Sequence, residues 1–125
     1  MAKPFGNYFF QSGGGSSSGT MTRFSVTSGQ SATNLAGEAF DGTIYTSIYY
    51  RFEIQQGTTI FSSGSFYVQY LNGTWQLILA GTFDNGTTTG VTFSLSQATT
   101  IGQLKAAEGG SGNGTIKLQK IFFNI

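Results

Sequence analysis

The chain has 125 residues, a formal net charge of +1, only 9% charged residues, and neither cysteine nor histidine. This length predicts a single domain, and the missing residue types exclude disulfides, thiolate chemistry and the commonest side chain for acid–base catalysis and transition-metal binding near neutral pH. The basic residues are scattered along the chain, so we expect no nucleic acid partner, because phosphate binding needs a basic stripe.

The N-terminal residues predict an arm on a flexible tether. Residues 1–11 carry the aromatic side chains of Phe5, Tyr8, Phe9 and Phe10, and residues 12–20 are all Gly, Ser or Thr. A tether of this kind and length reaches roughly 15 to 18 Å. Because exposed aromatic clusters are unfavourable in water, we expect the arm to pack on its own domain or, as we favour, on a neighbouring subunit. An engineered linker is the alternative origin of the tether.

The same N-terminal sequence has no apolar segment followed by a cleavage site, and no stretch of the chain approaches the length of a membrane span. We therefore expect neither export by the general route nor binding to a membrane.

Short turn sequences predict antiparallel strands joined by hairpins. In each of them a glycine, which adopts positive φ without strain, is followed by threonine, which favours a strand. They are Asp41-Gly42-Thr43, Gln56-Gly57-Thr58, Asn72-Gly73-Thr74, Asn85-Gly86-Thr87 and Asn113-Gly114-Thr115. The Asn72-Gly73 pair lies between two alternating segments and gives the strongest hairpin signal.

Alternation of apolar and polar residues predicts seven or eight strands. The longest runs from Thr43 to Ile54, with a core face that includes Ile44, Tyr50 and Ile54. The expected strands cover residues 21–28, 43–54, 58–61, 65–71, 74–80 (continuing through 81–83), 87–96 and 115–125, with a loop at 29–38.

Between Thr99 and Gly110 the apolar period changes. Thr100 and Gln103 fit a capping box, Ile101 and Leu104 share a helical face, and Gly109 is a natural stop. One short helix is therefore expected near residues 100–108.

These elements predict an all-β fold, a single-domain antiparallel β-sandwich of jelly-roll type over residues 21–125. A closed β-barrel is the alternative, since periodicity does not separate the two.

No group of side chains predicts catalysis. The three Asn-Gly-Thr triplets match the N-glycosylation pattern, but hairpin turns require the same residues. Asp41 and Asp84 lie in turns, and Glu53 is placed to form a surface ion pair with Arg51. Serine and threonine have no histidine to act as their base. We expect no enzyme activity, no catalytic residues, no cofactor and no metal site.

Outward-facing aromatic side chains are the remaining candidates. Tyr45, Tyr49 and Tyr67 lie opposite the expected core face, and Phe122 and Phe123 put apolar side chains on both faces of the last strand. Such rings form a second core, a protein interface or a ligand platform. The expected protein interface consists of Phe5, Tyr8, Phe9, Phe10, Tyr45, Tyr49, Phe122 and Phe123.

The arm Lys3-Pro4-Phe5-Gly6-Asn7-Tyr8-Phe9-Phe10, its Gly/Ser tether and a Gly-, Thr- and Phe-rich domain resemble small all-β virion proteins of tailed bacteriophages, in particular capsid decoration (cement) proteins. The resemblance implies a non-enzymatic structural protein of the virion, assembled in the host cytoplasm. It implies a homo-oligomer, with a trimer favoured, that stabilises a capsid by clamping the major capsid protein or other virion subunits with its arm.

Two other functions stay open. One is a carbohydrate-binding, lectin-like module that uses Tyr45, Tyr49, Tyr67 or Trp75. The other is a phage tail or fibre component, or a subunit of an extracellular filament in which the arm is donated as a strand.

Overall fold

A computed structural model describes residues 21–125. The predictions for the arm and the tether, residues 1–11 and 12–20, lie outside the described residues, and the domain boundary at residue 21 stays a prediction. The described residues form eight strands: β1 (Met21–Val26), β2 (Thr33–Asp41), β3 (Tyr45–Gln56), β4 (Ile60–Leu71), β5 (Thr74–Asp84), β6 (Val91–Ala98), β7 (Ile101–Glu108) and β8 (Gly114–Asn124).

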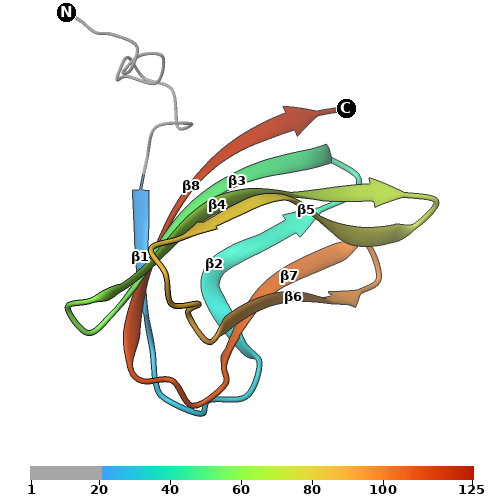
Figure 1. The fold of residues 1–125 in the computed structure, drawn as a ribbon. Helices are drawn as coiled ribbons and strands as arrows, with labels where there is room; N and C mark the ends of the chain where they lie inside the picture. Colours follow the sequence, from blue (N-terminus) through green and yellow to red (C-terminus); the bar gives the residue numbers. More distant parts are fainter. Residues whose placement is uncertain (1–20) are drawn as a thin grey trace, which may run out of the picture.

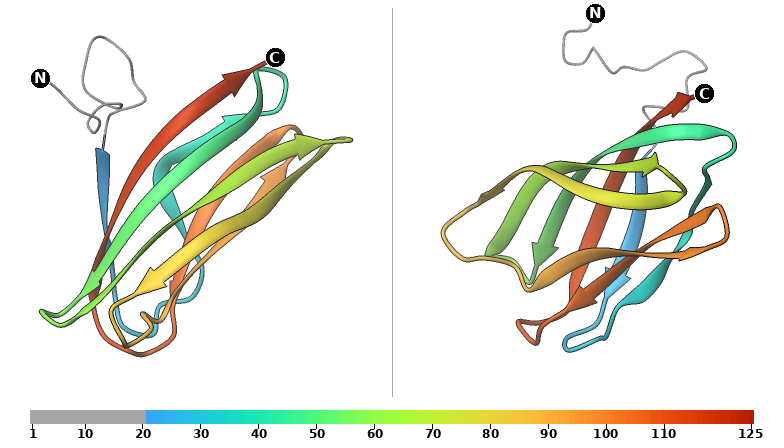
Figure 2. Two further views of the ribbon diagram at one scale, coloured as in Figure 1. Left: turned by 45° about the horizontal axis from the view of Figure 1, so that its top comes forward. Right: turned by 90° about the vertical axis from the view of Figure 1, so that its right-hand side faces the viewer.

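The strands form two antiparallel sheets packed face to face (Figure 1). The larger sheet has the order β1-β8-β3-β4-β5, and the smaller has the order β2-β7-β6. Figure 2 shows the two sheets as separate layers. Because the sheets do not close on each other, the predicted β-sandwich is confirmed and the closed barrel is wrong.

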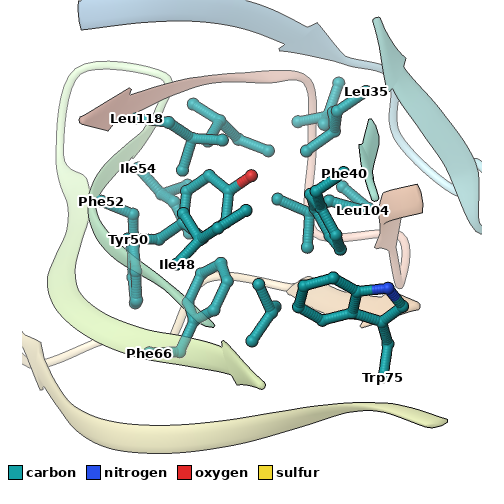
Figure 3. Close-up of a cluster of buried hydrophobic side chains, with 14 residues drawn as sticks. Leu35, Phe40, Ile48, Tyr50, Phe52, Ile54, Phe66, Trp75, Leu104 and Leu118 are labelled. Carbon is teal, nitrogen blue, oxygen red and sulfur yellow. The ribbon is translucent and has the colours of Figure 1, made fainter. Parts of the chain in front are cut away.

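The core lies between the two sheets, and β3 supplies much of it (Figure 3). Ile48, Tyr50, Phe52 and Ile54 are buried on the face that the alternation predicts. Ile44, expected on the same face, precedes β3 and is 51% exposed. The buried core consists of Val26, Leu35, Phe40, Ile48, Tyr50, Phe52, Ile54, Phe66, Val68, Trp75, Leu104, Ala106, Ile116 and Leu118.

The Asn72-Gly73 hairpin is confirmed between β4 and β5. Both residues have positive φ, 52° for Asn72 and 80° for Gly73, as a type I′ turn requires. The pairing runs from Leu71 opposite Thr74 to Phe66 opposite Leu79, beyond which the register shifts, so this turn fixes the register of the part of the two strands next to it.

The predicted helix near 100–108 is wrong, because these residues form β7, the central strand of the smaller sheet. Gly102, Leu104, Ala106 and Glu108 alternate inward, and the inward position at Gly102 has no room for a larger side chain. An added Cβ there would lie 2.6 Å from Phe40 Cε1. The inward face of β7 therefore carries small and charged residues beside Leu104, so the strand lacks the apolar alternation by which strands are recognised.

The predicted loop at 29–38 is wrong from residue 33 onward, where β2 begins. A bulge between Asn34 and Ala39 breaks the alternation, so that Leu35, Glu38 and Phe40 are all buried. The Gln103 side chain, predicted to cap a helix, instead donates to the carbonyl oxygens of Leu35 at 3.0 Å and Glu38 at 3.3 Å. Because a bulge interrupts the alternation of inward and outward side chains, the sequence of β2 does not show the pattern that predicts a strand.

Candidate interaction surfaces

The four predicted interface residues of the arm lie outside the described residues, and the other four occupy two different environments. Tyr45 stacks on Phe122 with ring centroids 4.5 Å apart, and both rings pack against the core. The outward placement of Tyr45 is therefore wrong, because a register shift between Tyr45 and Ser47 turns its side chain to the inner face. Phe123 is 46% exposed, and Tyr49 lies on the outer face.

A row of apolar side chains crosses the outer face of the larger sheet. Tyr49 is paired with Ile121 of β8 on one side and with Tyr67 of β4 on the other, and Tyr67 is paired with Ile78 of β5. Tyr67 is 40% and Ile78 44% exposed. We call Ile121, Tyr49, Tyr67 and Ile78 the outer row. The alternation in the sequence predicts the outward position of the two tyrosines but not that of the isoleucines, because only the strand register brings all four side chains into one row.

Charged residues occupy the same face beside the outer row. The predicted ion pair between Arg51 and Glu53 is confirmed at 4.0 Å between Nη2 and Oε2, and Arg51 Nη1 also donates to Gln119 Oε1 at 3.1 Å. Lys117 is paired with Glu53 across the strands. Because the ion pair is largely exposed, it contributes little to stability. Positive and negative side chains both occur on this face, so its electrostatic potential is weak.

One of the two edge strands of the larger sheet is β5, and it exposes large apolar side chains on both faces. Leu79 is paired with Phe66 and so belongs to the inner face, yet it is 66% exposed. Phe83 lies opposite Ser63 on the outer face and is 76% exposed. A free strand edge with exposed apolar side chains on both faces is a template for further pairing.

A cavity of about 170 Å³ lies between β5 and β6, the edge strands of the two sheets. Its apolar lining includes Phe52, Ile54, Leu77, Leu79, Val91 and Phe93. At its polar end the hydroxyls of Ser62 and Thr89 lie 3.2 Å apart, within hydrogen-bond distance. We call this cavity the edge pocket.

The buried carboxylate of Glu108 closes the end of the sandwich opposite the Asn72-Gly73 turn. It accepts hydrogen bonds from the backbone N–H groups of Gly29 at 2.9 Å, Gly110 at 2.6 Å and Ser111 at 2.9 Å, and from Gln56 Nε2 at 2.8 Å. These bonds, the Gly29 amide first, lower the pKa of Glu108 to about 2 against the opposing effect of burial. The carboxylate is buried because Glu108 belongs to β7 and faces the inside of the sandwich.

The turn carboxylate Asp41 has the predicted structural role. Its Oδ1 accepts from the backbone N–H and the hydroxyl of Thr43, both at 2.9 Å, and from the Thr100 hydroxyl at 3.0 Å. These bonds, the Thr43 amide first, lower the pKa of Asp41. Across residues 21–125, no three acidic, His or Cys side chains are grouped so that they could hold a metal ion.

The asparagines of the Asn-Gly-Thr triplets also take structural roles. Asn85 Oδ1 accepts from the Phe61 N–H at 3.0 Å, and Asn113 Oδ1 accepts from the Ser28 N–H at 2.8 Å. Asn72 occupies the first position of its hairpin turn, at φ 52°. The turn chemistry accounts for all three triplets.

Trp75 does not contribute to an exposed platform. It is 5% exposed, packs edge-on against Phe40 at 4.7 Å between centroids, and donates from Nε1 to the Thr100 carbonyl at 3.0 Å. Its proposed use in sugar binding is therefore wrong. None of the described residues belongs to a helix that could cross a membrane.

No protein-family model and no curated protein matches the chain. Among solved structures, it is similar to the tailspike protein of Acinetobacter phage vB_ApiP_P1, with 14% identity and a TM-score of 0.54 over 84% of this chain and 22% of that chain. The tailspike protein of Acinetobacter baumannii phage AM24 is similar at 14% identity and a TM-score of 0.39, over 83% of this chain and 26% of that chain. The chain spans about a fifth of the first tailspike, and the likeness to it is one of fold.

Proposed function

We propose that this chain is a non-enzymatic structural module of a phage virion, located in a tail spike or fibre, which holds neighbouring subunits together. The observation that carries the proposal is the apolar surface of the larger sheet, where Ile78, Leu79 and Phe83 of a single edge strand are 44%, 66% and 76% exposed. Exposed apolar surface of this kind marks protein interaction sites. The fold shared with part of a phage tailspike supports a place in the tail.

The aromatic arm supplies the second half of the proposed mechanism. Phe5, Tyr8, Phe9 and Phe10 bind apolar surface on a neighbouring subunit, and each fully buried ring stabilises the contact by about 2 to 3 kcal/mol before the cost of ordering the arm. Repetition over several subunits turns these modest contacts into a stable assembly. The trimeric state stays part of this proposal.

Stabilisation of a capsid is the alternative location for the same mechanism, with the major capsid protein as the partner. The arm and the exposed sheet would serve equally there, but the fold comparison supports the tail. Electron microscopy of phage particles labelled with antibodies against the chain separates the two: label at the tail supports the proposal, and label over the head favours the capsid.

Assembly itself is tested by light scattering coupled to size-exclusion chromatography of the full chain. We expect an oligomer that dissociates when residues 1–11 are deleted. A full chain that stays at the monomer mass of 13.3 kDa at all concentrations contradicts the structural proposal.

A carbohydrate platform is the second candidate function, and one observation favours it. The half-buried ring of Tyr49 and the exposed ring of Tyr67 lie side by side, with centroids 5.1 Å apart and planes inclined by 57°. A glycan array distinguishes the two functions: the structural role predicts no signal, whereas a platform predicts a signal that Tyr67→Ala abolishes.

A further inference from the structure

The edge pocket has the size of one aromatic ring. Its volume is about 170 Å³, and an apolar cavity of about 150 Å³ is large enough to bind benzene. Phe52, Leu77, Val91 and Phe93 line it from both sheets, so a phenyl group that entered would contact both layers of the sandwich.

The strand beside the pocket is ready to pair with another strand. β5 ends the order of the larger sheet and β6 ends that of the smaller, so both flank the pocket with free edges. Along β5, Leu79 is exposed on the inner face and Ile78 and Phe83 on the outer face. An added strand would therefore meet apolar side chains on both of its own faces.

The arm has the matching pattern. Tyr8, Phe9 and Phe10 are consecutive, and successive side chains of a strand point to opposite faces. If the arm were added to the sheet as a strand beside β5, Tyr8 and Phe10 would lie on one face of the sheet and Phe9 on the other. No other segment of the chain outside the described residues carries aromatic side chains.

The described chain begins at the edge of the larger sheet that lies farthest from β5. The described chain begins at Met21 in β1, and β1 and β5 are opposite edges of the larger sheet. Four steps between neighbouring strands, at about 4.8 Å each, separate them by roughly 19 Å in a straight line through the sheet. The average reach of the tether, roughly 15 to 18 Å, is less than this separation, so an arm bound to β5 of its own chain would have to keep the tether stretched beyond its average length. This favours an arm from a second copy.

We propose that the edge pocket and the free edge of β5 bind the aromatic arm, residues 1–11, of a second copy of this chain by strand addition. This inference rests on the proposed function and names the receptor for its arm. Heterologous contacts of this type form closed rings or filaments according to the angle between copies.

A mixing experiment on the full chain tests the proposal. The arm variant is Tyr8→Ser/Phe9→Ser/Phe10→Ser, and the pocket variant is Leu79→Lys, which changes an exposed side chain and puts a charge at the free edge. We expect each variant alone to associate at least tenfold more weakly than the unchanged chain, and an equimolar mixture to regain a complex of twice the monomer mass. Leu71→Lys, at an exposed site on the outer face by the hairpin turn, is the matched control and should assemble normally.

A wrong receptor assignment and a wrong proposed function give different results in this experiment. If the unchanged chain assembles and the arm variant does not, but Leu79→Lys assembles normally, the arm binds elsewhere and the receptor assignment is overturned while the proposed function stands. If neither variant alters the assembly, both the assignment and the role of the arm are overturned.

Disulfide trapping gives an independent readout, because the chain has no cysteine of its own. The Phe9→Cys variant and the Leu79→Cys variant are mixed, and oxidised glutathione is added as the oxidant that forms the disulfide. We expect a covalent dimer at least tenfold more abundant than with Leu71→Cys in place of Leu79→Cys. A chain that carries both Phe9→Cys and Leu79→Cys provides the opposite outcome. If it forms only an intramolecular disulfide and stays a monomer, each arm binds its own domain and the proposal is overturned.

Discussion

Tyr50 of the larger sheet donates a hydrogen bond of 2.9 Å to Glu38 Oε1 of the smaller sheet, and both residues are buried. Lys120 binds the same oxygen at 2.8 Å and lies 5.3 Å from the centre of the Phe122 ring. Burial, followed by the charge of Glu38, raises the pKa of Tyr50. A buried polar contact thus links the two sheets.

Tyr50→Phe removes the donor and leaves a buried charged acceptor with one partner fewer. Because hydrogen bonds to charged groups contribute about 1.5 to 3 kcal/mol, we expect the free energy of unfolding in urea to fall by about that amount. Tyr49→Phe, the neighbouring substitution on the outer face, is the control and should change it by less than about 0.5 kcal/mol. Equal effects of the two would mean that the contact adds nothing to stability.

Glu108 makes stability depend on acid pH. Its pKa is about 2 in the folded chain and about 4.3 when unfolded, so the folded state favours the carboxylate. The stabilisation is complete above the unfolded value and is lost as the pH falls from about 4.3 towards 2. In Glu108→Gln, we expect the urea midpoint to be lower at pH 7 and to depend less on pH over this range.

The control for this titration is Glu53→Gln, which changes an exposed carboxylate. At pH 7 its free energy of unfolding should stay within about 0.5 kcal/mol of that of the unchanged chain. If Glu108→Gln kept the full acid dependence, other carboxylates would have to account for it.

The sequence reveals the parts of this fold that local chemistry determines. The alternation of β3 and the Asn72-Gly73 turn depend on residues that are neighbours in the chain, and both predictions are confirmed. In β7, the choice of Gly102 is set by Phe40 and Trp75, which belong to two other strands. A composition imposed by distant residues cannot be recognised from a local period, and a helix was predicted instead.

The candidate surfaces show the same division. Alternation placed Tyr49 and Tyr67 correctly on the outer face, whereas the register shift next to Tyr45 reversed that residue without any sign in the sequence. Ile78 and Ile121 extend the outer row only because four strands pair in one particular register. The edge pocket was not predicted at all, because it arises from the relative position of two sheets.

Gly102→Ala tests the close packing of Phe40 and Trp75 against Gly102 of β7. The new Cβ would lie 2.6 Å from Phe40 Cε1 and 2.8 Å from Trp75 Cδ1, and neither ring is free to move within the core. Overpacking of this kind costs about 1 to 3 kcal/mol, so we expect a lower melting temperature and a shifted emission from Trp75, the single tryptophan. Gly81→Ala is the control, since nothing lies within 4 Å of its added Cβ.

We expect the outer row to lower the solubility of the protein while contributing little to its free energy of unfolding. With 9% charged residues, the chain has little electrostatic protection against association, and Tyr67 and Ile78 are 40% and 44% exposed. In Tyr67→Ser/Ile78→Ser, we expect the polyethylene glycol concentration that precipitates the protein to rise. The lost cross-strand contacts should lower the free energy of unfolding by only about 0.2 to 1 kcal/mol per pair. A loss of several kcal/mol with unchanged solubility would mean that these side chains act as a second core and do not form an exposed interaction surface.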